Sequence, residues 1–238
     1  MTAFTLKIIA LTAMLTDHLY IVFPDIFPFW FRGIGRLAYP IFVFLLAESF
    51  RHTKAPEKFL MRLLIFAVVS EIPYDLALGN DINFITNTNI FYTLFLGGMA
   101  ICLYERMKER HGWQTMAVIA AILPTAILAE ILTVDYGGMG VLFIFAMYVV
   151  KPTILRLTAL SGFALSQFLP LVMAYHLDIK IPTEYILMIP FALAVIPLIA
   201  LYNGKRGIQA KWLFYLAYPA HLAVLAVIAM MINNFQLS

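Results

Sequence analysis

The chain has 238 residues, of which 63% are hydrophobic and 12% are charged, with a formal net charge of +3. Soluble domains carry about 25% charged residues, so this composition excludes a soluble protein and indicates an integral membrane protein. We expect a single domain over residues 1–238, because no stretch is polar enough to form a separate soluble domain. The single cysteine, Cys102, excludes an internal disulfide, and its apolar surroundings favour a packing role.

Apolar segments recur along the whole chain. A helix needs about 20 mostly apolar residues to cross the hydrocarbon core of a bilayer. The first segment is long enough to span and no small-residue cleavage site follows it, so we expect a permanent helix there rather than a signal peptide. The sequence therefore predicts an all-α, polytopic membrane helix bundle with nine transmembrane helices. The predicted spans are residues 5–23, 35–51, 58–78, 88–106, 113–132, 138–151, 154–175, 184–202 and 211–233.

Basic residues lie almost entirely in alternate connections between these spans. Of the 16 Lys and Arg residues, all but Arg32, Arg36 and Lys180 lie at the start of the first span or at the connections after the second, fourth, sixth and eighth spans, counting the adjoining span ends. Cytoplasmic loops carry an excess of Lys and Arg, so we predict a cytoplasmic N-terminus and an outer C-terminus. We expect these loops to act mainly as topology signals, while a role in holding an anionic co-substrate stays open.

The pair Asp17-His18 lies inside the first apolar segment. A charge in a spanning helix costs roughly 2.5–3.5 kcal/mol on insertion scales, so the pair is a functional hypothesis by default. Lys7 precedes His18 by 11 residues, which is about 16 Å along a helix and nearly the same face. Coenzyme A is long enough to extend along this helix face, with its anionic head at Lys7 and its reactive end near His18.

Further ionisable residues fall in the predicted outer half of the bundle. Glu71 and Asp75 are four residues apart and share a helix face. Isolated ions would be costly there, so we expect pairing, and Arg36 with Glu71 or Asp75 forms either a structural ion pair or part of a site. Seven residues are candidates to converge: Asp17, His18, Arg36, Glu71, Asp75, Asp135 and His221.

Neighbouring residues on a helix point about 100° apart, so we expect a carboxylate from another helix, rather than Asp17, to orient His18. His221 is either a hydrogen-bonded core histidine or a member of the site. Two histidines with carboxylates could also bind a metal, but no HxxxH or HxxE ligand spacing is present, and we predict no metal site.

Several segments, in order along nearly the whole chain, resemble the TraX family of membrane proteins, which is named for the acetylase of conjugative pilin. They are residues 6–11 (LKIIAL) with Asp17-His18, 35–42 (GRLAYPIF), 62–64 (RLL) with 70–75 (SEIPYD), 89–91 (NIF), 135–137 (DYG), 202–207 (YNGKRG) and 214–221 (FYLAYPAH).

The resemblance implies acetyl transfer to the N-terminal amine of a pilin-like peptide in the bacterial inner membrane. Lys7 and His18 are also similar to the basic-x10-His signature of the transmembrane acyltransferases (the acyltransferase-3 group). That group usually has arginine at the basic position. Lysine meets a phosphate as a point charge, without the bidentate fork of arginine.

The resulting hypothesis is a membrane-embedded N- or O-acetyltransferase that uses acetyl-CoA as co-substrate. Lys7, Lys205 and Arg206 would hold its phosphates at the cytoplasmic face, and His18 would be the general base, with a covalent acetyl-histidine as a variant. The acceptor would be a peptide, a pilin or a glycan reached from the outer side, and we expect lipid but no nucleic acid as a partner. The catalytic set would be His18, Asp17, Glu71, Asp75 and Arg36, with His221 and Asp135 as possible additional members.

In this hypothesis Glu71 or Asp75 would orient His18, and Arg36 would balance those carboxylates or steady the thioester oxygen. Two alternatives stay open. A proton-coupled transporter would use the same buried His, Asp and Glu residues, although no inverted repeat is apparent. A non-enzymatic assembly factor for a surface appendage would not need Asp17-His18 at that depth.

Overall fold

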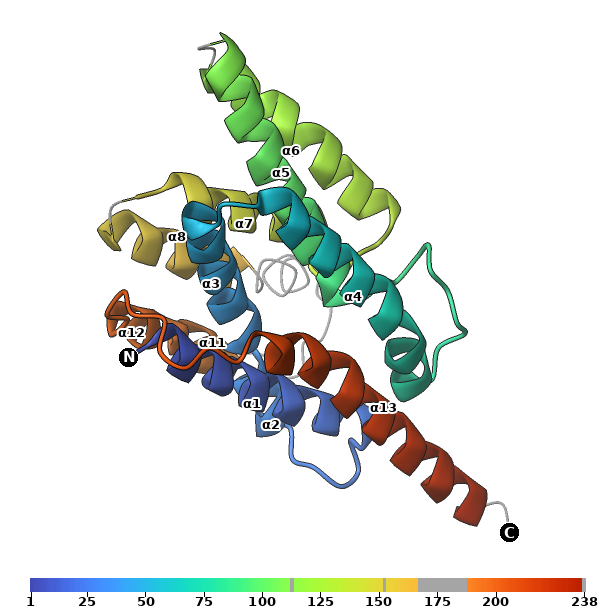
Figure 1. Ribbon diagram of the computed structural model, residues 1–238. Helices are drawn as coiled ribbons and strands as arrows, with labels where there is room; N and C mark the ends of the chain where they lie inside the picture. The colour runs from blue at the N-terminus through green and yellow to red at the C-terminus, as the bar shows by residue number, and fades with distance from the viewer. Residues whose placement is uncertain (112–113, 152, 167–187, 237–238) are drawn as a thin grey trace, which may run out of the picture. The chain divides into compact units, whose positions relative to one another are not determined.

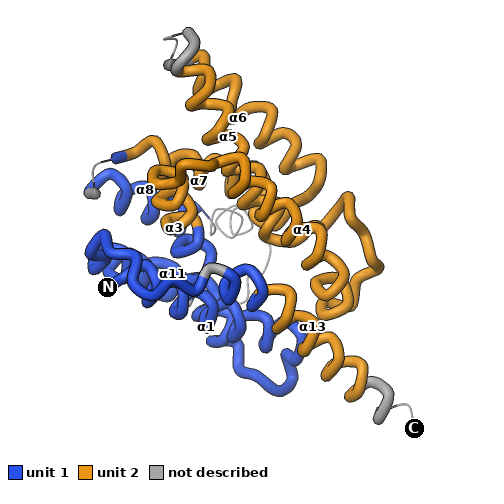
Figure 2. Tube along the Cα trace, in the orientation of Figure 1, with its two compact units in different colours: residues 1–42, 151–217 blue, residues 43–150, 218–238 orange. Residues whose placement is uncertain are grey.

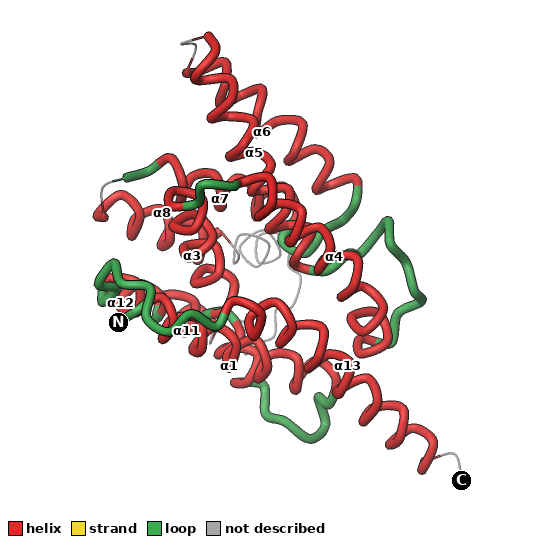
Figure 3. The backbone as a smooth tube through the Cα atoms, viewed as in Figure 1, coloured by secondary structure: helices red, strands yellow, loops and turns green. Residues whose placement is uncertain are grey.

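The computed structural model describes residues 1–111, 114–151, 153–166 and 188–236 (Figure 1). Over these ranges the chain forms helices joined by loops, without strands, as the red and green tube in Figure 3 shows. The predicted all-α class is confirmed. The second half of the seventh predicted span and Lys180 lie outside the described residues.

Each of the nine predicted spans overlaps helix in the described part of the chain, and the helix ends differ from the predicted bounds by a few residues. The helices are α1 (Ala3–Val22), α2 (Trp30–Gly35), α3 (Ala38–His52), α4 (Pro56–Leu78), α5 (Ile90–His111), α6 (Gln114–Ile131), α7 (Gly137–Val149), α8 (Thr153–Ser166), α11 (Met188–Leu193), α12 (Val195–Ala200) and α13 (Lys211–Gln236). The eighth predicted span, in its described part, is two short helices, α11 and α12. The short helix α2 begins five residues before the predicted start of the second span, so Arg32 belongs to a helix rather than to a loop.

Four helical segments of the described chain are long and apolar enough to cross a bilayer by themselves. They are Ala3–Val22, Trp30–His52, Ile90–Lys108 and Trp212–Ile232. Shorter apolar helices accompany them. The chain is therefore a multi-pass helical membrane protein, while the number of nine crossings and the cytoplasmic N-terminus stay predictions.

The chain divides into two compact units, drawn in different colours in Figure 2. Unit 1 comprises residues 1–42 and 151–217, and unit 2 comprises residues 43–150 and 218–238. Helices α3 and α13 each contribute residues to both units. Neither unit is one continuous stretch of chain, and the single domain over residues 1–238 stays a prediction.

Helix α4 begins and ends at residues with suitable local chemistry. Pro56 occupies the first helical position, where its missing N–H costs no hydrogen bond. Gly79 closes the helix in the left-handed conformation, with φ +72°, a region that favours glycine. Pro73 lies inside α4 without ending it, which membrane helices tolerate when neighbouring groups satisfy the freed carbonyl.

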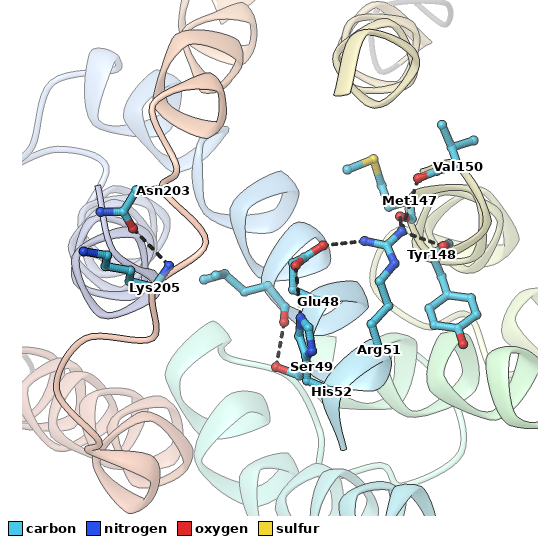
Figure 4. Close-up of polar contacts among 10 residues, drawn as sticks. Glu48, Ser49, Arg51, His52, Met147, Tyr148, Val150, Asn203 and Lys205 are labelled. Atoms are coloured by element: carbon cyan, nitrogen blue, oxygen red, sulfur yellow. Dashed lines mark hydrogen bonds and ion pairs between the residues drawn. The ribbon is translucent and has the colours of Figure 1, made fainter. Parts of the chain in front are cut away.

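One end of unit 2 joins three connections that the charge pattern assigns to the same side. Arg51, at the end of α3, donates to the carbonyls of Met147 and Tyr148 at the end of α7, at 2.7 and 2.5 Å (Figure 4). Arg106, near the end of α5, pairs with Glu57 at the start of α4. The connections after the second, fourth and sixth spans therefore lie together, as the predicted alternation requires.

The opposite end of unit 2 joins the two remaining connections of that unit. The Asp135 N–H donates to the Thr88 carbonyl at 3.1 Å, and the Asn87 N–H donates to Thr133 Oγ1 at 2.6 Å. The connections after the third and fifth spans are thus side by side. Both ends of unit 2 agree with the alternation of sides that the basic residues predict.

The Arg51→Ala variant tests the importance of the first of these ends. The Arg51 guanidinium donates hydrogen bonds to carbonyls at the C-terminus of α7 that have no partner within the helix, and it pairs with Glu48. We therefore expect Arg51→Ala to lower the free energy of unfolding by about 2 kcal/mol. The matched control is Arg106→Ala, whose ion pair with Glu57 is solvent-exposed and should be worth less than about 1 kcal/mol. Equal losses in detergent unfolding titrations would contradict the capping role of Arg51.

Candidate functional site

The start of α1 in unit 1 is closed by a loop from far along the chain. Thr2 is the N-cap residue, and its hydroxyl accepts from the Thr5 N–H at 3.2 Å. The N–H groups of Ala3 and Phe4 donate to the carbonyls of Lys205 and Arg206, at 2.9 and 3.0 Å. The contacts bring the predicted basic residues Lys205 and Arg206 to the first turn of α1.

Lys7 lies one turn further along α1, where it is half-buried. Its Nζ lies 4.8 Å from the centre of the Phe214 ring, a cation–π contact with α13. Helix α1 continues unbroken to Val22, so Lys7 and His18 keep the helical spacing that the sequence predicts. His18 is 9% exposed and shares the buried face of α1.

Asp17 forms ion pairs with two arginines of unit 1. Arg32 Nη1 lies 2.8 Å from Asp17 Oδ1, and Arg36 Nη2 lies 3.2 Å from Asp17 Oδ2. Helix α2 packs on α1, and Gly35 lies directly against the Asp17 side chain. Both carboxylate oxygens are engaged, so Asp17 holds α2 on α1.

These pairs differ from the predicted ones. The sequence favours Glu71 or Asp75 as the partner of Arg36, whereas the structure gives Asp17 as a partner of both Arg36 and Arg32. A signal was present, because these two arginines are exceptions to the charge alternation. A cation on the predicted outer side, near a carboxylate at a similar depth, indicates an ion pair.

Glu71 lies fully buried in α4 of unit 2. Its Oε2 accepts from the backbone N–H of Asn89 at 3.3 Å and from the Asn89 side-chain amide. The same amide donates to the Ala67 carbonyl at 2.8 Å, and Asn89 Oδ1 accepts from the Phe91 N–H at 3.0 Å. Asn89 thus ties α4 to the start of α5. Glu71 Oε1 has no hydrogen-bond partner among the described residues.

Asp75, one turn after Glu71, is also buried. Its Oδ2 accepts from the Asn83 N–H at 2.8 Å, which holds the loop between α4 and α5. Asp135, in the same region, is exposed. Its backbone carbonyl accepts a hydrogen bond from the Thr93 hydroxyl. Asp75 and Asp135 therefore help to organise the loops at this end of unit 2.

His221 joins the same region through Tyr218 of α13. The two rings are edge-to-face with centroids 5.5 Å apart, and Tyr218 also contacts Phe91 edge-to-face at 5.2 Å. The Tyr218 phenol is buried and within electrostatic range of Glu71. Asn89 and Tyr218 were not predicted as site residues, although an asparagine before an apolar helix is a recognisable N-cap signal.

The predicted site residues thus form two groups, one in each unit. Within the described chain, no three His, Cys, Asp or Glu side chains gather closely enough to hold a metal ion. Unit 1 holds Lys7, Asp17, His18, Arg36, Lys205 and Arg206, and unit 2 holds Glu71, Asp75, Asp135 and His221.

Comparison with protein families matches residues 3–229 to the family described as TraX protein. The chain belongs to the TraX family. The match extends over nearly the whole chain and confirms the resemblance found in the sequence blocks. The similarity to the acyltransferase-3 group rests on the spacing of Lys7 and His18 and stays a prediction.

A curated relative agrees with this assignment. The TraX-family chain is 29% identical over 242 aligned residues to a probable fimbrial assembly protein FimC, serogroup H1, of Dichelobacter nodosus. The alignment covers 94% of each protein. No solved structure matches the chain significantly. The comparisons support a membrane protein related to pilus assembly, while the roles of the individual site residues stay predictions.

Proposed function

We propose that this TraX-family protein is a membrane-embedded acetyltransferase that moves acetyl from cytoplasmic acetyl-CoA to an acceptor at the outer side of the bacterial inner membrane. The observation that carries the proposal is the arrangement along α1. Three basic residues gather at its first two turns, and a buried histidine lies further along the same unbroken helix.

The residues at the start of α1 fit a phosphorylated co-substrate through their side chains. The N–H groups of Ala3, Phe4 and Thr5 already donate to loop carbonyls and to Thr2, so they cannot bind an anion. Lys205 and Arg206 are exposed, and Lys7 is half-buried. Three cations at this end would meet the phosphates, and the distance of about 16 Å from Lys7 to His18 would suit the extended pantetheine arm.

His18 would act as the general base. A neutral imidazole accepts a proton from the acceptor amine or hydroxyl as its nitrogen or oxygen attacks the thioester carbonyl carbon. The new C–N or C–O bond replaces the C–S bond, and His18 returns the proton to the leaving thiolate, so that coenzyme A departs as the thiol. In the covalent variant the acetyl group is carried briefly by the imidazole.

The acceptor is proposed to be a pilin-like N-terminal amine. The support is membership of the TraX family and the relative whose name gives fimbrial assembly.

The experiment is a calorimetric or thermal-shift titration of purified protein in detergent with acetyl-CoA. We expect saturable binding that weakens at least tenfold in Lys7→Ala. The His18→Ala variant should still bind acetyl-CoA but should transfer acetyl at least about 100-fold more slowly, the range for loss of a general base. The control is Lys58→Ala, an exposed lysine of unit 2 that should change neither quantity.

Absence of binding at millimolar acetyl-CoA in a folded sample would overturn the proposal. The transporter alternative would then gain weight from the buried carboxylates Glu71 and Asp75, since ionisable residues at membrane depth also mark transport pathways. The assembly-factor alternative predicts neither acetyl-CoA binding nor proton-coupled uptake.

A further inference from the structure

The loop of residues 201–207 has a defined backbone conformation. Asn203 Oδ1 accepts from the Lys205 N–H at 3.0 Å, and Gly204 and Gly207 have φ of +74° and +70°. A Cβ atom at Gly207 would lie 2.7 Å from Thr2 Oγ1, so only glycine fits against the start of α1. Two left-handed glycines and a side-chain turn fix this loop in one shape.

The loop is also docked through its carbonyls. The carbonyls of Lys205 and Arg206 accept from Ala3 and Phe4, and the Asn203 N–H donates to the Met1 carbonyl at 2.9 Å. The side chains of Lys205 and Arg206 are exposed and follow each other directly on this fixed backbone. Figure 4 shows the Asn203 side chain that accepts from the Lys205 N–H. A topology signal requires positive charge in a loop, but it does not require this geometry.

The three basic residues stand in a definite order along α1. The Lys205–Arg206 pair lies at the level of residues 3 and 4, and Lys7 lies about 5 Å further along the helix axis. His18 follows about 16 Å beyond Lys7. The order from the start of α1 is therefore the exposed pair Lys205–Arg206, then the half-buried Lys7, then the buried His18.

Acetyl-CoA carries its groups in a matching order. Its ribose phosphate monoester stands at one end, the diphosphate follows, and the pantetheine arm ends in the thioester. A phosphate monoester carries about −1.5 to −2 charges near pH 7 and is well matched by two cations, one of them the planar fork of arginine. We infer that Lys205 and Arg206 bind the ribose phosphate monoester, while Lys7 binds the diphosphate. The inference rests on the proposed function.

The test is a thermodynamic cycle on the full-length protein in detergent. Binding of acetyl-CoA and of acetyl-dephospho-CoA, which lacks the monoester, is measured by calorimetry for the wild type, Arg206→Ala and Lys7→Ala. We expect the wild type to bind acetyl-dephospho-CoA about tenfold more weakly than acetyl-CoA. Arg206→Ala should lose a similar factor for acetyl-CoA and nothing further for acetyl-dephospho-CoA, whereas Lys7→Ala should weaken both ligands alike.

Two control variants accompany the binding measurements. Arg206→Lys keeps the charge without the fork and should recover part of the lost affinity, and Lys58→Ala should bind both ligands as the wild type does. Equal losses for both ligands in Arg206→Ala, or no difference between the ligands in the wild type, would overturn the inference and leave the proposed function intact. If the wild type binds neither ligand, both fail together.

Discussion

Replacement of Asn89 by alanine is expected to lower the free energy of unfolding by about 3 kcal/mol, the upper end of the range for leaving buried polar groups without a hydrogen-bond partner. Asn89 donates to Glu71 and to the Ala67 carbonyl, and it accepts from the Phe91 N–H. Alanine would remove all three side-chain contacts. The remaining bond from the backbone N–H, at 3.3 Å, would leave the fully buried carboxylate poorly compensated.

The measurement is an unfolding titration in mixed detergent micelles. Asn80→Ala is the matched control, because Asn80 is exposed and a surface substitution should change the free energy by less than about 0.5 kcal/mol. The double variant Asn89→Ala/Glu71→Met should regain part of the lost free energy of unfolding, because the buried carboxylate is removed together with its hydrogen-bond donor. Additive losses in the double variant would show that Asn89 and Glu71 do not act as a pair.

The helices were predictable because a membrane helix can be recognised from the composition of its own short segment of sequence. The apolar runs, the charge alternation and the helix stop at Gly79 are all properties of short segments. Helix α2 was not predicted, since the residues Trp30–Gly35 contain two glycines, which disfavour helix by about 1 kcal/mol each. Packing compensates, because Gly35 lets α2 approach Asp17 and lets two arginines reach it.

The site was predictable in its residue types but not in its pairings. Ionisable residues inside apolar spans stand out in any sequence, and all ten predicted site residues fall within described parts of the chain. The pairing of carboxylates with cations depends on how the helices are rotated and which helices are in contact. Neither can be read from the sequence of one segment. The partner of Glu71 is an amide that begins α5, and Asp17 pairs with α2, so both pairings come from tertiary structure.

The two groups of predicted residues differ in the way they compensate charge. In unit 1, Asp17 meets two arginines, and the cations Lys7, Lys205 and Arg206 gather at the other end of α1. In unit 2, Glu71 is held by neutral donors and keeps one oxygen without a partner among the described residues. The first arrangement suits an anionic co-substrate. The second leaves a carboxylate able to accept one further hydrogen bond.

Substitution of Gly35 by alanine should lower the free energy of unfolding by about 2–3 kcal/mol, within the range for overpacking. A Cβ atom there would lie 2.6 Å from Asp17 Oδ1 and still closer to the Asp17 Cβ and Cγ atoms. Asp17 would have to move, which would strain its ion pairs with Arg32 and Arg36. The steric cost must exceed the gain of about 1 kcal/mol that alanine brings to a helix.

Gly162 in α8 provides the matched control in the same unit. A Cβ atom at Gly162 meets nothing within 4 Å, so Gly162→Ala should gain up to about 1 kcal/mol from helix propensity alone. The same detergent titration should therefore give opposite signs for the same chemical change in two helices of unit 1. Equal effects at the two positions would mean that α2 does not approach Asp17 closely. The ion pairs of Asp17 would then lose their structural support, because they depend on that approach.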